Sequence, residues 1–134
     1  MSAFFDTNIL IYAYSTDARR ARALNLISAG GVISAQVLNE FTNVLRKKQK
    51  QDWGVIEAAL QSLRFRFPDI LPLTADTHAA ALALASGHGL GFYDALILAS
   101  AIEGGCDTLY SEDLQNGRSF GQLVVINPFL ASTP

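Results

Sequence analysis

Hydrophobic positions along the chain form two kinds of pattern, short apolar runs and longer stretches with helical spacing. The apolar runs have the length of buried strands. They cover residues 3–5, 32–34, 70–73, 108–111 and 123–126. Between them, apolar residues recur at intervals of three and four, which is typical of helices with one buried face. The expected helices cover residues 8–14, 17–28, 35–50, 52–67, 76–86 and 94–103.

The order of these elements predicts the fold class. Strands that alternate with helices form a parallel sheet, and such a sheet needs helices on both faces. The stretch 94–103 is apolar on nearly every side, so we expect that helix to be buried almost completely. No repeat, linker or low-complexity tract divides the chain. We therefore expect one domain over residues 1–134, a three-layer α/β/α sandwich with a central parallel sheet.

The composition is typical of a globular domain in a reducing compartment. The chain has 134 residues, of which 50% are hydrophobic and 16% charged, and its mean hydropathy is +0.24. Disorder is therefore not expected. A single cysteine, Cys106, excludes a disulfide scaffold. The sequence shows neither a signal-peptide pattern nor a run of membrane-spanning length, so we expect a soluble, cytoplasmic protein.

The charges are distributed unevenly along the chain. The formal net charge is −2, yet residues 1–66 carry nine of the ten Lys and Arg residues, and residues 67–134 carry seven of the twelve acids. A near-neutral total argues against a nucleic-acid partner held by overall attraction. Each basic run is either a solvated helix face or a rim that contacts phosphates. The two runs are Arg19, Arg20, Arg22 and Arg46, Lys47, Lys48, Lys50.

Acidic residues follow two predicted strands and open the buried helix. Asp6 directly follows the first strand, and Asp113 comes shortly after the strand over 108–111. Asp94 begins the buried helix after a glycine-rich turn. Ligand sites of open parallel sheets form outside the carboxyl ends of the strands. We therefore expect these three side chains to lie at one edge of the sheet.

Glu40 lies on the face that its own helix is expected to bury. It stands three residues after Val37 and four before Val44. An unpaired carboxylate in an apolar setting is costly, and no basic residue lies within one turn to compensate it. A metal ion would account for this position. Carboxylates without nearby His or Cys suit Mg²⁺ or Mn²⁺ rather than zinc.

Each of these acids also has a purely structural interpretation. Asp6 and Asp94 stand where N-caps of helices are expected. Glu112 and Asp113 fit solvated positions of a turn, and Glu40 could reach water from the edge of its helix. The metal site is favoured because all of them converge on one corner of the sheet.

Other common catalytic groups are weak candidates. His78 lies on an alanine-rich helix, His88 in a glycine turn and Cys106 at the edge of a strand, positions typical of structural residues. The chain has no P-loop, no GxGxxG and no GxSxG motif. These absences exclude the usual nucleotide hydrolases, dinucleotide enzymes and serine esterases.

In its acidic motifs the chain resembles PIN-domain ribonucleases, and within them the VapC-type toxins of bacterial toxin–antitoxin pairs. The resemblance runs from Phe4 to Phe129 and rests on the order and spacing of short motifs. It implies a PIN-like fold and metal-dependent hydrolysis of RNA phosphodiester bonds, which leaves a 5′-phosphate and a 3′-hydroxyl. The motifs are Phe5-Asp6-Thr7-Asn8, Asn39-Glu40, Tyr93-Asp94-Ala95, Ser111-Glu112-Asp113-Leu114 and Val125-Ile126-Asn127-Pro128-Phe129.

The resemblance also implies roles for residues, a cofactor and partners. The implied catalytic and metal-binding acids are Asp6, Glu40, Asp94 and Asp113, with Asn8 and Ser111 as polar neighbours. The family's fourth acid best matches Asp113, so the participation of Glu112 stays open. The cofactor would be Mg²⁺ or Mn²⁺, and the partners would be RNA, a cognate antitoxin and a second copy of the chain in a homodimer. The side chains then expected to contact the RNA backbone are Arg19, Arg20, Arg22, Arg46 and Lys47.

Two other functions remain as alternatives. The first is a catalytically silent PIN-like domain that only binds RNA or a partner; the presence of all four acids argues against it. The second is a phosphatase-like α/β domain in which Asp6 is a covalent nucleophile. Such phosphatases carry a second Asp two residues after the first, where this chain has Asn8, and a catalytic Lys is missing from the second half.

Overall fold

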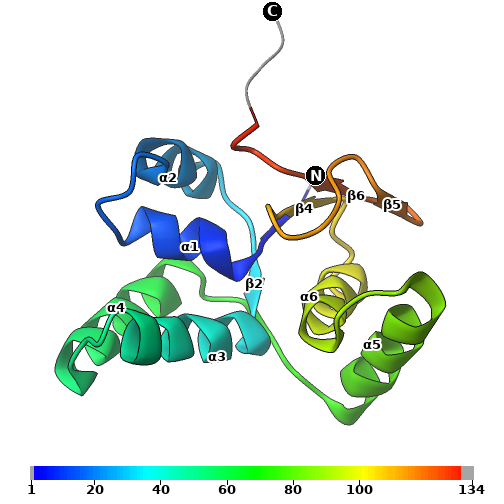
Figure 1. Cartoon of the computed structure of the whole chain (residues 1–134), viewed down its shortest axis with the longest axis horizontal. Coiled ribbons are helices and arrows are strands. Elements are labelled where there is room, and N and C mark those ends of the chain that lie inside the picture. Colours follow the sequence, from blue (N-terminus) through cyan, green and yellow to red (C-terminus); the bar gives the residue numbers. More distant parts are fainter. Residues whose placement is uncertain (1, 131–134) are drawn as a thin grey trace, which may run out of the picture.

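A central sheet of four short strands organises the computed structural model, which describes residues 2–130 (Figure 1). Its strand order is β1-β4-β6-β5, in which β5 pairs antiparallel with β6 and the other pairs are parallel. A separate parallel pair, β2 and β3, is joined to β1 by a bridge between Phe4 and Val32. The strands are β1 (Ala3–Phe5), β2 (Ile33–Ser34), β3 (Ile70–Leu71), β4 (Thr108–Tyr110), β5 (Ser119–Phe120) and β6 (Leu123–Ile126).

Helices surround these strands. In Figure 1, α1 and α2 lie together on one side of the strands, and α5 and α6 lie together on the other. The expected α/β fold with a central, mostly parallel sheet is thereby confirmed. The helices are α1 (Thr7–Ala13), α2 (Arg20–Ser28), α3 (Ala35–Asn43), the π-helical segment η1 (Val44–Lys48), α4 (Trp53–Arg66), α5 (Ala75–His88) and α6 (Phe92–Glu103).

Several predicted boundaries are wrong because side chains near the helix ends make unexpected contacts. The predicted helix over 17–28 begins only at Arg20, since the Asp17 carboxylate accepts the backbone N–H and the guanidinium of Arg19 and closes a turn there. The helix α5 begins at Ala75 because Thr74 forms a capping box with Thr77. The short strand β5 is absent from the prediction.

The predicted helix over 35–50 contains a change of helix type. After α3, the segment η1 widens to π-helical geometry, and the backbone N–H of Gln49 donates to the carbonyl of Val44 (3.1 Å). A π turn accommodates one more residue than an α turn and is rare outside functional or strained positions. Hydrophobic spacing alone does not reveal it, because Leu45 is buried as an α-helix would also require.

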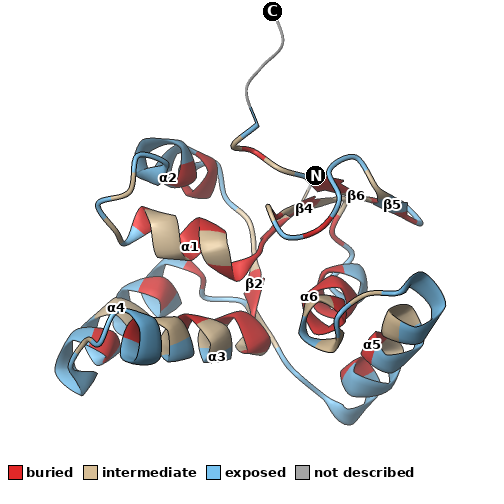
Figure 2. Ribbon diagram, in the orientation of Figure 1, coloured by how far each residue is buried: buried red, intermediate tan, exposed pale blue. Residues whose placement is uncertain are grey.

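The hydrophobic core lies between the sheet and the helices (Figure 2). Phe4, Phe5, Leu109 and Val125 on the strands are fully buried. The helix α6 is buried continuously over 95–101, which confirms the expectation from its apolar composition. Among residues 2–130, no single helix is long and apolar enough to cross a membrane, although α5 and α6 pass the length and composition criteria together as a pair bent by 118°.

Strand register determines which residues emerge together at the carboxyl edge of the sheet. Phe5 pairs with Tyr110, and Tyr110 pairs with Ile126. The residues that follow these positions, Asp6 and Ser111, are therefore neighbours even though 105 residues separate them. The topology thus places the first candidate acid beside the loop that carries the others.

Candidate functional site

Asp6 lies at the junction of β1 and α1 and is almost fully buried. Its Oδ1 accepts the backbone N–H of Thr7 (2.7 Å) and caps α1, so the capping interpretation is confirmed. Its Oδ2 accepts the hydroxyl of Ser111 (2.7 Å). The backbone N–H of Asp6 donates to the carbonyl of Tyr110 (3.0 Å). Strand pairing and capping therefore fix the direction of this carboxylate.

Ser111 connects Asp6 to the loop that carries Asp113. Besides donating to Asp6, the Ser111 hydroxyl accepts the backbone N–H groups of Asp113 (3.2 Å) and Leu114 (3.4 Å). From α1, the Asn8 side-chain amide donates to both carboxylate oxygens of Asp113 (3.3 and 3.2 Å). The structure thus brings Asp6, Asn8, Ser111 and Asp113 into one hydrogen-bonded group.

Glu40 joins this group from α3, where it is half-buried. Thr7 donates its hydroxyl to Oε1 (2.7 Å), and Gln36 donates its side-chain amide to Oε2 (3.1 Å). The sequence interpretation missed both partners. Gln36 stands one helical turn before Glu40, which is a usable signal. The contact with Thr7 bridges 33 residues and has no local signal. Both donors are neutral, so they orient the carboxylate and leave its charge in place.

Asp94 occupies the first turn of α6 and is half-buried. The N-cap of this helix is Gly91, which makes no side-chain hydrogen bond, so the capping interpretation of Asp94 is wrong. The helix begins earlier than predicted because Phe92 and Tyr93 are already helical. A Cβ atom on Gly91 would lie 3.7 Å from Oδ2 of Asp94, which shows how close this backbone passes to the carboxylate.

Burial and repulsion between acids raise the pKa of Asp6. Its pKa rises from 3.8 to about 7, chiefly because burial penalises the charged form. Hydrogen bonds from Ser111 and Thr7 act in the opposite direction, and the charges of Asp113 and Glu40 raise the pKa further. Asp6 is therefore protonated in a large fraction of molecules near neutral pH.

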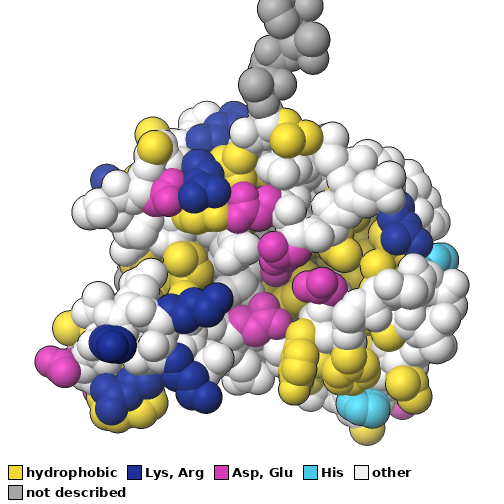
Figure 3. Space-filling view, in the orientation of Figure 1, with side chains coloured by type: hydrophobic (Ala, Val, Ile, Leu, Met, Phe, Trp, Pro, Cys, Tyr) yellow, Lys and Arg dark blue, Asp and Glu magenta, His cyan; other side chains and the backbone are white. Residues whose placement is uncertain are grey.

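The same coupling extends to the other two aspartates. Burial and then the charge of Glu40 raise the pKa of Asp94. Burial and then the charges of Asp94 and Glu112 raise the pKa of Asp113, which Lys48 lowers. The four acids therefore repel one another, and Figure 3 shows the resulting acidic cluster in the middle of one face of the molecule. We call Asp6, Glu40, Asp94 and Asp113 the acidic cluster.

Glu112 lies beside the acidic cluster but has partners of its own. The Tyr12 hydroxyl donates to one of its carboxylate oxygens, and the Arg19 guanidinium lies 3.5 Å from the other. Arg19 also stacks over the Tyr12 ring at 4.0 Å and pairs with Asp17 at 2.8 Å. Glu112 is thus paired with a cation, whereas within residues 2–130 none of the four acids of the cluster forms a salt bridge.

The basic residues expected to contact RNA differ in whether their side chains already contact other groups of the protein. Arg19 is engaged as just described, and Arg22 donates to the carbonyl of Pro128 (3.3 Å). Arg46 donates to the carbonyl of Gln51 (3.1 Å) and stacks on Trp53 at 4.5 Å. Lys48 lies close enough to the acidic cluster to lower the pKa of Asp113, although we did not select it from the basic run. The RNA contacts of Arg19, Arg20, Arg22, Arg46 and Lys47 stay predictions.

The acidic cluster has the chemistry of a site for a hard divalent ion. All four side chains offer carboxylate oxygens as ligands. The pKa values of the three aspartates are raised, in part by the charges of neighbouring acids, so the protein leaves negative charge at this site unbalanced. As the side chains stand, no three His, Cys, Asp or Glu residues within 2–130 are close enough to enclose one ion. This arrangement fits Mg²⁺, which keeps several waters and uses one or two carboxylates together with substrate phosphates.

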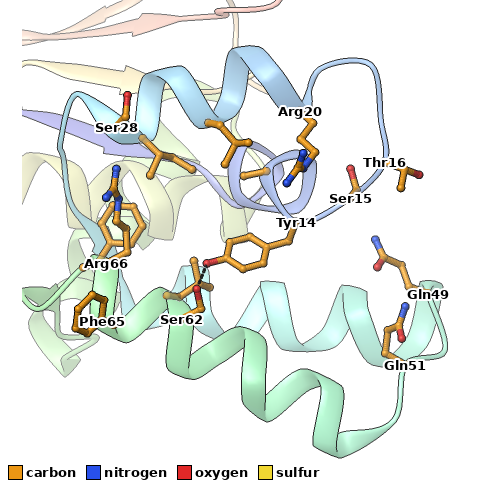
Figure 4. A pocket seen from close by; sticks show the side chains of 15 residues that line it. Tyr14, Ser15, Thr16, Arg20, Ser28, Gln49, Gln51, Ser62, Phe65 and Arg66 are labelled. Carbon is orange, nitrogen blue, oxygen red and sulfur yellow. Dashed lines mark hydrogen bonds between the residues drawn. The ribbon is translucent and has the colours of Figure 1, made fainter.

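A second concave surface has a different character. We call this groove the α2–α4 groove (Figure 4). Its lining residues come from α1, α2, α4 and the segments that follow α1 and η1, and none of them is acidic. Buried Ile27, Leu63 and Phe67 contribute to its lining, together with exposed Phe65. Within it, the hydroxyls of Tyr14 and Ser62 are hydrogen-bonded at 2.7 Å. Arg20 and Arg66 line it at separate places, as Figure 4 shows.

The chain is an α/β domain of the open-sheet class, with a cluster of carboxylates beyond the carboxyl edge of its sheet. Within this class, the model of the PIN domain family matches residues 3–116. The chain belongs to the PIN domain family. Comparison with curated proteins finds no match.

Solved structures similar to this chain share its fold. A toxin–antitoxin complex from Klebsiella pneumoniae is 24% identical with a TM-score of 0.72, over 96% of this chain and 98% of that chain. VapC20 from Mycobacterium tuberculosis, described as a sarcin–ricin loop cleaving toxin, is 23% identical with a TM-score of 0.65, over 82% and 88%. VapBC2 from Rickettsia felis, bound to a DNA fragment from its promoter, is 21% identical with a TM-score of 0.65, over 93% and 97%.

Proposed function

We propose that this protein is a metal-dependent endoribonuclease that acts as the toxin of a type II toxin–antitoxin pair. The observation that carries the proposal is the acidic cluster, in which four carboxylates from distant parts of the chain meet without a basic side chain hydrogen-bonded to any of them. Membership of the PIN domain family and the likeness to toxin structures support it.

Asp6, Glu40, Asp94 and Asp113 would hold the divalent ion, Mg²⁺ or Mn²⁺, one or two of them directly and the others through its waters. When bound, such an ion lowers the pKa of a coordinated water and stabilises the charge that develops on the phosphate. The protein prepares the ligands. Ser111 and the Thr7 backbone aim Asp6, and Asn8 aims Asp113. Because Asp6 has a pKa of about 7, metal binding releases a proton from part of the molecules at neutral pH.

RNA would approach the acidic cluster across the basic residues of the first half of the chain. The positive charge of Lys48 acts on the acidic cluster, since it lowers the pKa of Asp113. Arg46 and Lys47 precede it on the same exposed segment. These side chains suit phosphate contacts that do not depend on sequence.

The α2–α4 groove fits the antitoxin. Its lining combines apolar side chains, uncharged polar ones and two arginines, without an acid, and so suits an amphipathic partner segment that carries acidic residues. Leu24 lines the groove and is 40% exposed. We expect Leu24→Glu to weaken capture of the short protein encoded next to this gene at least about tenfold, with RNA cleavage by the free enzyme unchanged. If the natural protein and Leu24→Glu capture this partner equally well, the antitoxin does not bind in the α2–α4 groove. The homodimer remains a separate prediction.

The experiment that tests the proposed function compares the protein with Asp94→Asn. We expect cleavage of single-stranded RNA in Mg²⁺ or Mn²⁺ to fall about 100-fold or more in the variant and to stop in EDTA. Circular dichroism should show an unchanged fold, because Asp94 makes no capping contact. Growth inhibition on expression should disappear in parallel. A fully active Asp94→Asn protein would exclude the proposal.

The alternatives have their own readouts. A silent PIN-like domain would give no heat of Mn²⁺ binding in calorimetry. A phosphatase-like enzyme would form an aspartyl-phosphate on Asp6. That role finds no support in the geometry, because Asp6 is 4% exposed and both of its carboxylate oxygens accept hydrogen bonds.

A further inference from the structure

Tyr93 is a large aromatic residue that the protein leaves exposed directly beside the acidic cluster. Its side chain is 66% exposed, although it stands in the first turn of an otherwise buried helix. The next residue is Asp94, and Figure 3 shows apolar side chains bordering the acidic cluster on this face. The ring is therefore available to a planar ligand beside the acidic cluster.

The Tyr93 ring has one aromatic neighbour. The rings of Phe92 and Tyr93 meet edge to face, with centroids 5.8 Å apart and an interplanar angle of 70°. Phe92 in turn packs against His78 of α5 at 5.1 Å. The helix turn that carries Tyr93 is therefore packed against the neighbouring helix through Phe92. A backbone that is already ordered before binding lowers the entropy cost of stacking a planar ligand on this side chain.

Two different elements offer complementary contacts to a nucleic-acid strand at the acidic cluster. From η1, Lys48 supplies a positive charge that acts on Asp113. From α6, Tyr93 supplies an exposed aromatic ring next to Asp94 in the sequence. Proteins that bind single strands combine these same elements, cations for the backbone and aromatic rings for the bases.

We propose that Tyr93 is a nucleobase platform, on which one base of a single-stranded RNA stacks while the adjoining phosphate lies at the acidic cluster. This inference rests on the proposed ribonuclease function and adds the element of substrate recognition to it. Stacking tolerates every base, so the platform would favour unpaired RNA over duplex and would read little sequence.

The test measures binding of a short labelled single-stranded RNA by fluorescence anisotropy in Mn²⁺, with cleavage followed on gels. We expect Tyr93→Ala to bind about 5- to 150-fold more weakly than the natural protein, and Tyr93→Phe to stay within about twofold. Leu82→Ala is the control, because Leu82 on α5 is 56% exposed and belongs neither to the acidic cluster nor to the lining of the α2–α4 groove. Its RNA affinity should not change.

A second probe isolates the contribution of the bases. A strand with the same sugar–phosphate backbone but without bases should bind the natural protein and Tyr93→Ala equally. Equal affinity of both proteins for the base-containing RNA would overturn the proposal. So would a lower molecular mass of Tyr93→Ala in sedimentation, because the ring would then belong to an interface between copies of the chain.

The outcomes also separate this inference from the proposed function. If the natural protein cleaves RNA and Tyr93→Ala binds and cleaves equally well, the platform is wrong and the ribonuclease stands. If the natural protein binds RNA in a Tyr93-dependent way but does not cleave it, the platform stands and the ribonuclease is wrong. A natural protein that neither binds nor cleaves RNA would overturn both.

Discussion

At the residue scale, the Asp6 side chain both caps a helix and belongs to the acidic cluster. One carboxylate oxygen caps α1, and the other accepts the Ser111 hydroxyl from the neighbouring strand end. Both contacts favour the charged form, yet burial outweighs them and leaves the pKa at about 7. The metal-free protein therefore carries a free-energy cost at this position whenever Asp6 is ionised.

Replacing Asp6 with Asn should make the metal-free protein less sensitive to pH. In the folded protein Asp6 binds its proton up to about pH 7, against 3.8 as the ordinary value. The native state holds more protons in this window, so the free energy of unfolding falls as the pH rises from about 4 to 7. Asn carries no charge and escapes this loss. We expect Asp6→Asn to be more stable than the natural protein at pH 8, by about 1 to 3 kcal/mol.

Urea denaturation in EDTA at pH 5 and pH 8 measures this effect. Asp94 and Asp113 have pKa values raised in the same direction, so part of the pH dependence will persist in the variant. Added Mn²⁺ should reverse the order of stability, because it binds the natural protein and not Asp6→Asn; saturation 100-fold above the dissociation constant is worth about 2.7 kcal/mol. Unfolding curves of the two proteins with the same pH dependence would contradict the role of Asp6.

At the element scale, α1 contacts two successive acids of one loop through different residues. Asn8 and Tyr12 lie one turn apart on the helix, and they contact Asp113 and Glu112 respectively. Asn8 leaves the Asp113 charge available, whereas Tyr12 and Arg19 engage Glu112. These contacts support the proposal that Asp113, and not Glu112, is the fourth acid of the metal site. Because Asn8 and Tyr12 are four residues apart on this 7-residue helix, they share one face and contact the two neighbouring carboxylates separately.

Removing the Tyr12 hydroxyl should loosen this arrangement. The hydroxyl donates to a carboxylate, and such charge-assisted bonds are stronger than neutral ones. We expect Tyr12→Phe to lower the free energy of unfolding by about 1 to 2 kcal/mol in urea denaturation at pH 7. Tyr14→Phe is the matched control, because the Tyr14 hydroxyl pairs only with the neutral Ser62. Similar losses in both variants would show that Glu112 adds nothing to the bond.

The elements themselves were largely predictable, because each buries a face that hydrophobic spacing records. The strand over Leu123–Ile126 appears with the predicted bounds, and α6 is buried as its composition requires. The first turn of α6 and the start of α2 were missed, since Tyr93 is exposed and Asp17 forms a local turn with Arg19. Spacing cannot show these features, because side-chain hydrogen bonds and exposure decide them.

The candidate site was predictable only in part. The four acids could be selected because they follow strands or face a buried helix side. Their supporting contacts could not, since Thr7 reaches Glu40 across 33 residues and Ser111 reaches Asp6 across 105. Such pairs depend on how elements pack, which no local pattern in a single sequence encodes.

At the scale of the whole molecule, opposite charges are sorted onto neighbouring surfaces. Two acids of the cluster, Asp6 and Asp113, follow strands and the other two lie on α3 and α6, whereas Lys47 and Lys48 lie on η1 and Lys50 just beyond it. In Figure 3, most of the Lys and Arg side chains on this face lie to the left of the acidic cluster, and another group lies at the right edge. A strand of RNA could thus be attracted by one surface and delivered to the other once metal neutralises the acids.

The salt dependence of RNA binding tests this division. For single strands, the slope of log affinity against log salt is about −0.7 per phosphate neutralised. Changing Arg46, Lys47 and Lys48 together to Ala should therefore make the slope shallower by about 2 and weaken binding to all sequences alike. Arg118→Ala serves as control, because Arg118 is occupied by His88 and Phe120. An unchanged slope in the triple variant would place the RNA path elsewhere.

The π turn of η1 determines how a change of chain length would affect the basic surface. Because the π turn already accommodates one extra residue, deleting Val44 would give an α turn and leave Lys48 on its present side of the helix axis. Deleting one residue from the α-helical α3 would instead rotate Lys48 by about 100° around the axis and turn it away from Asp113, while every charge of η1 stayed in the sequence. A change of chain length ahead of η1 is therefore a single genetic step that redirects the basic surface, whereas the π turn itself can lose a residue and keep that surface in place.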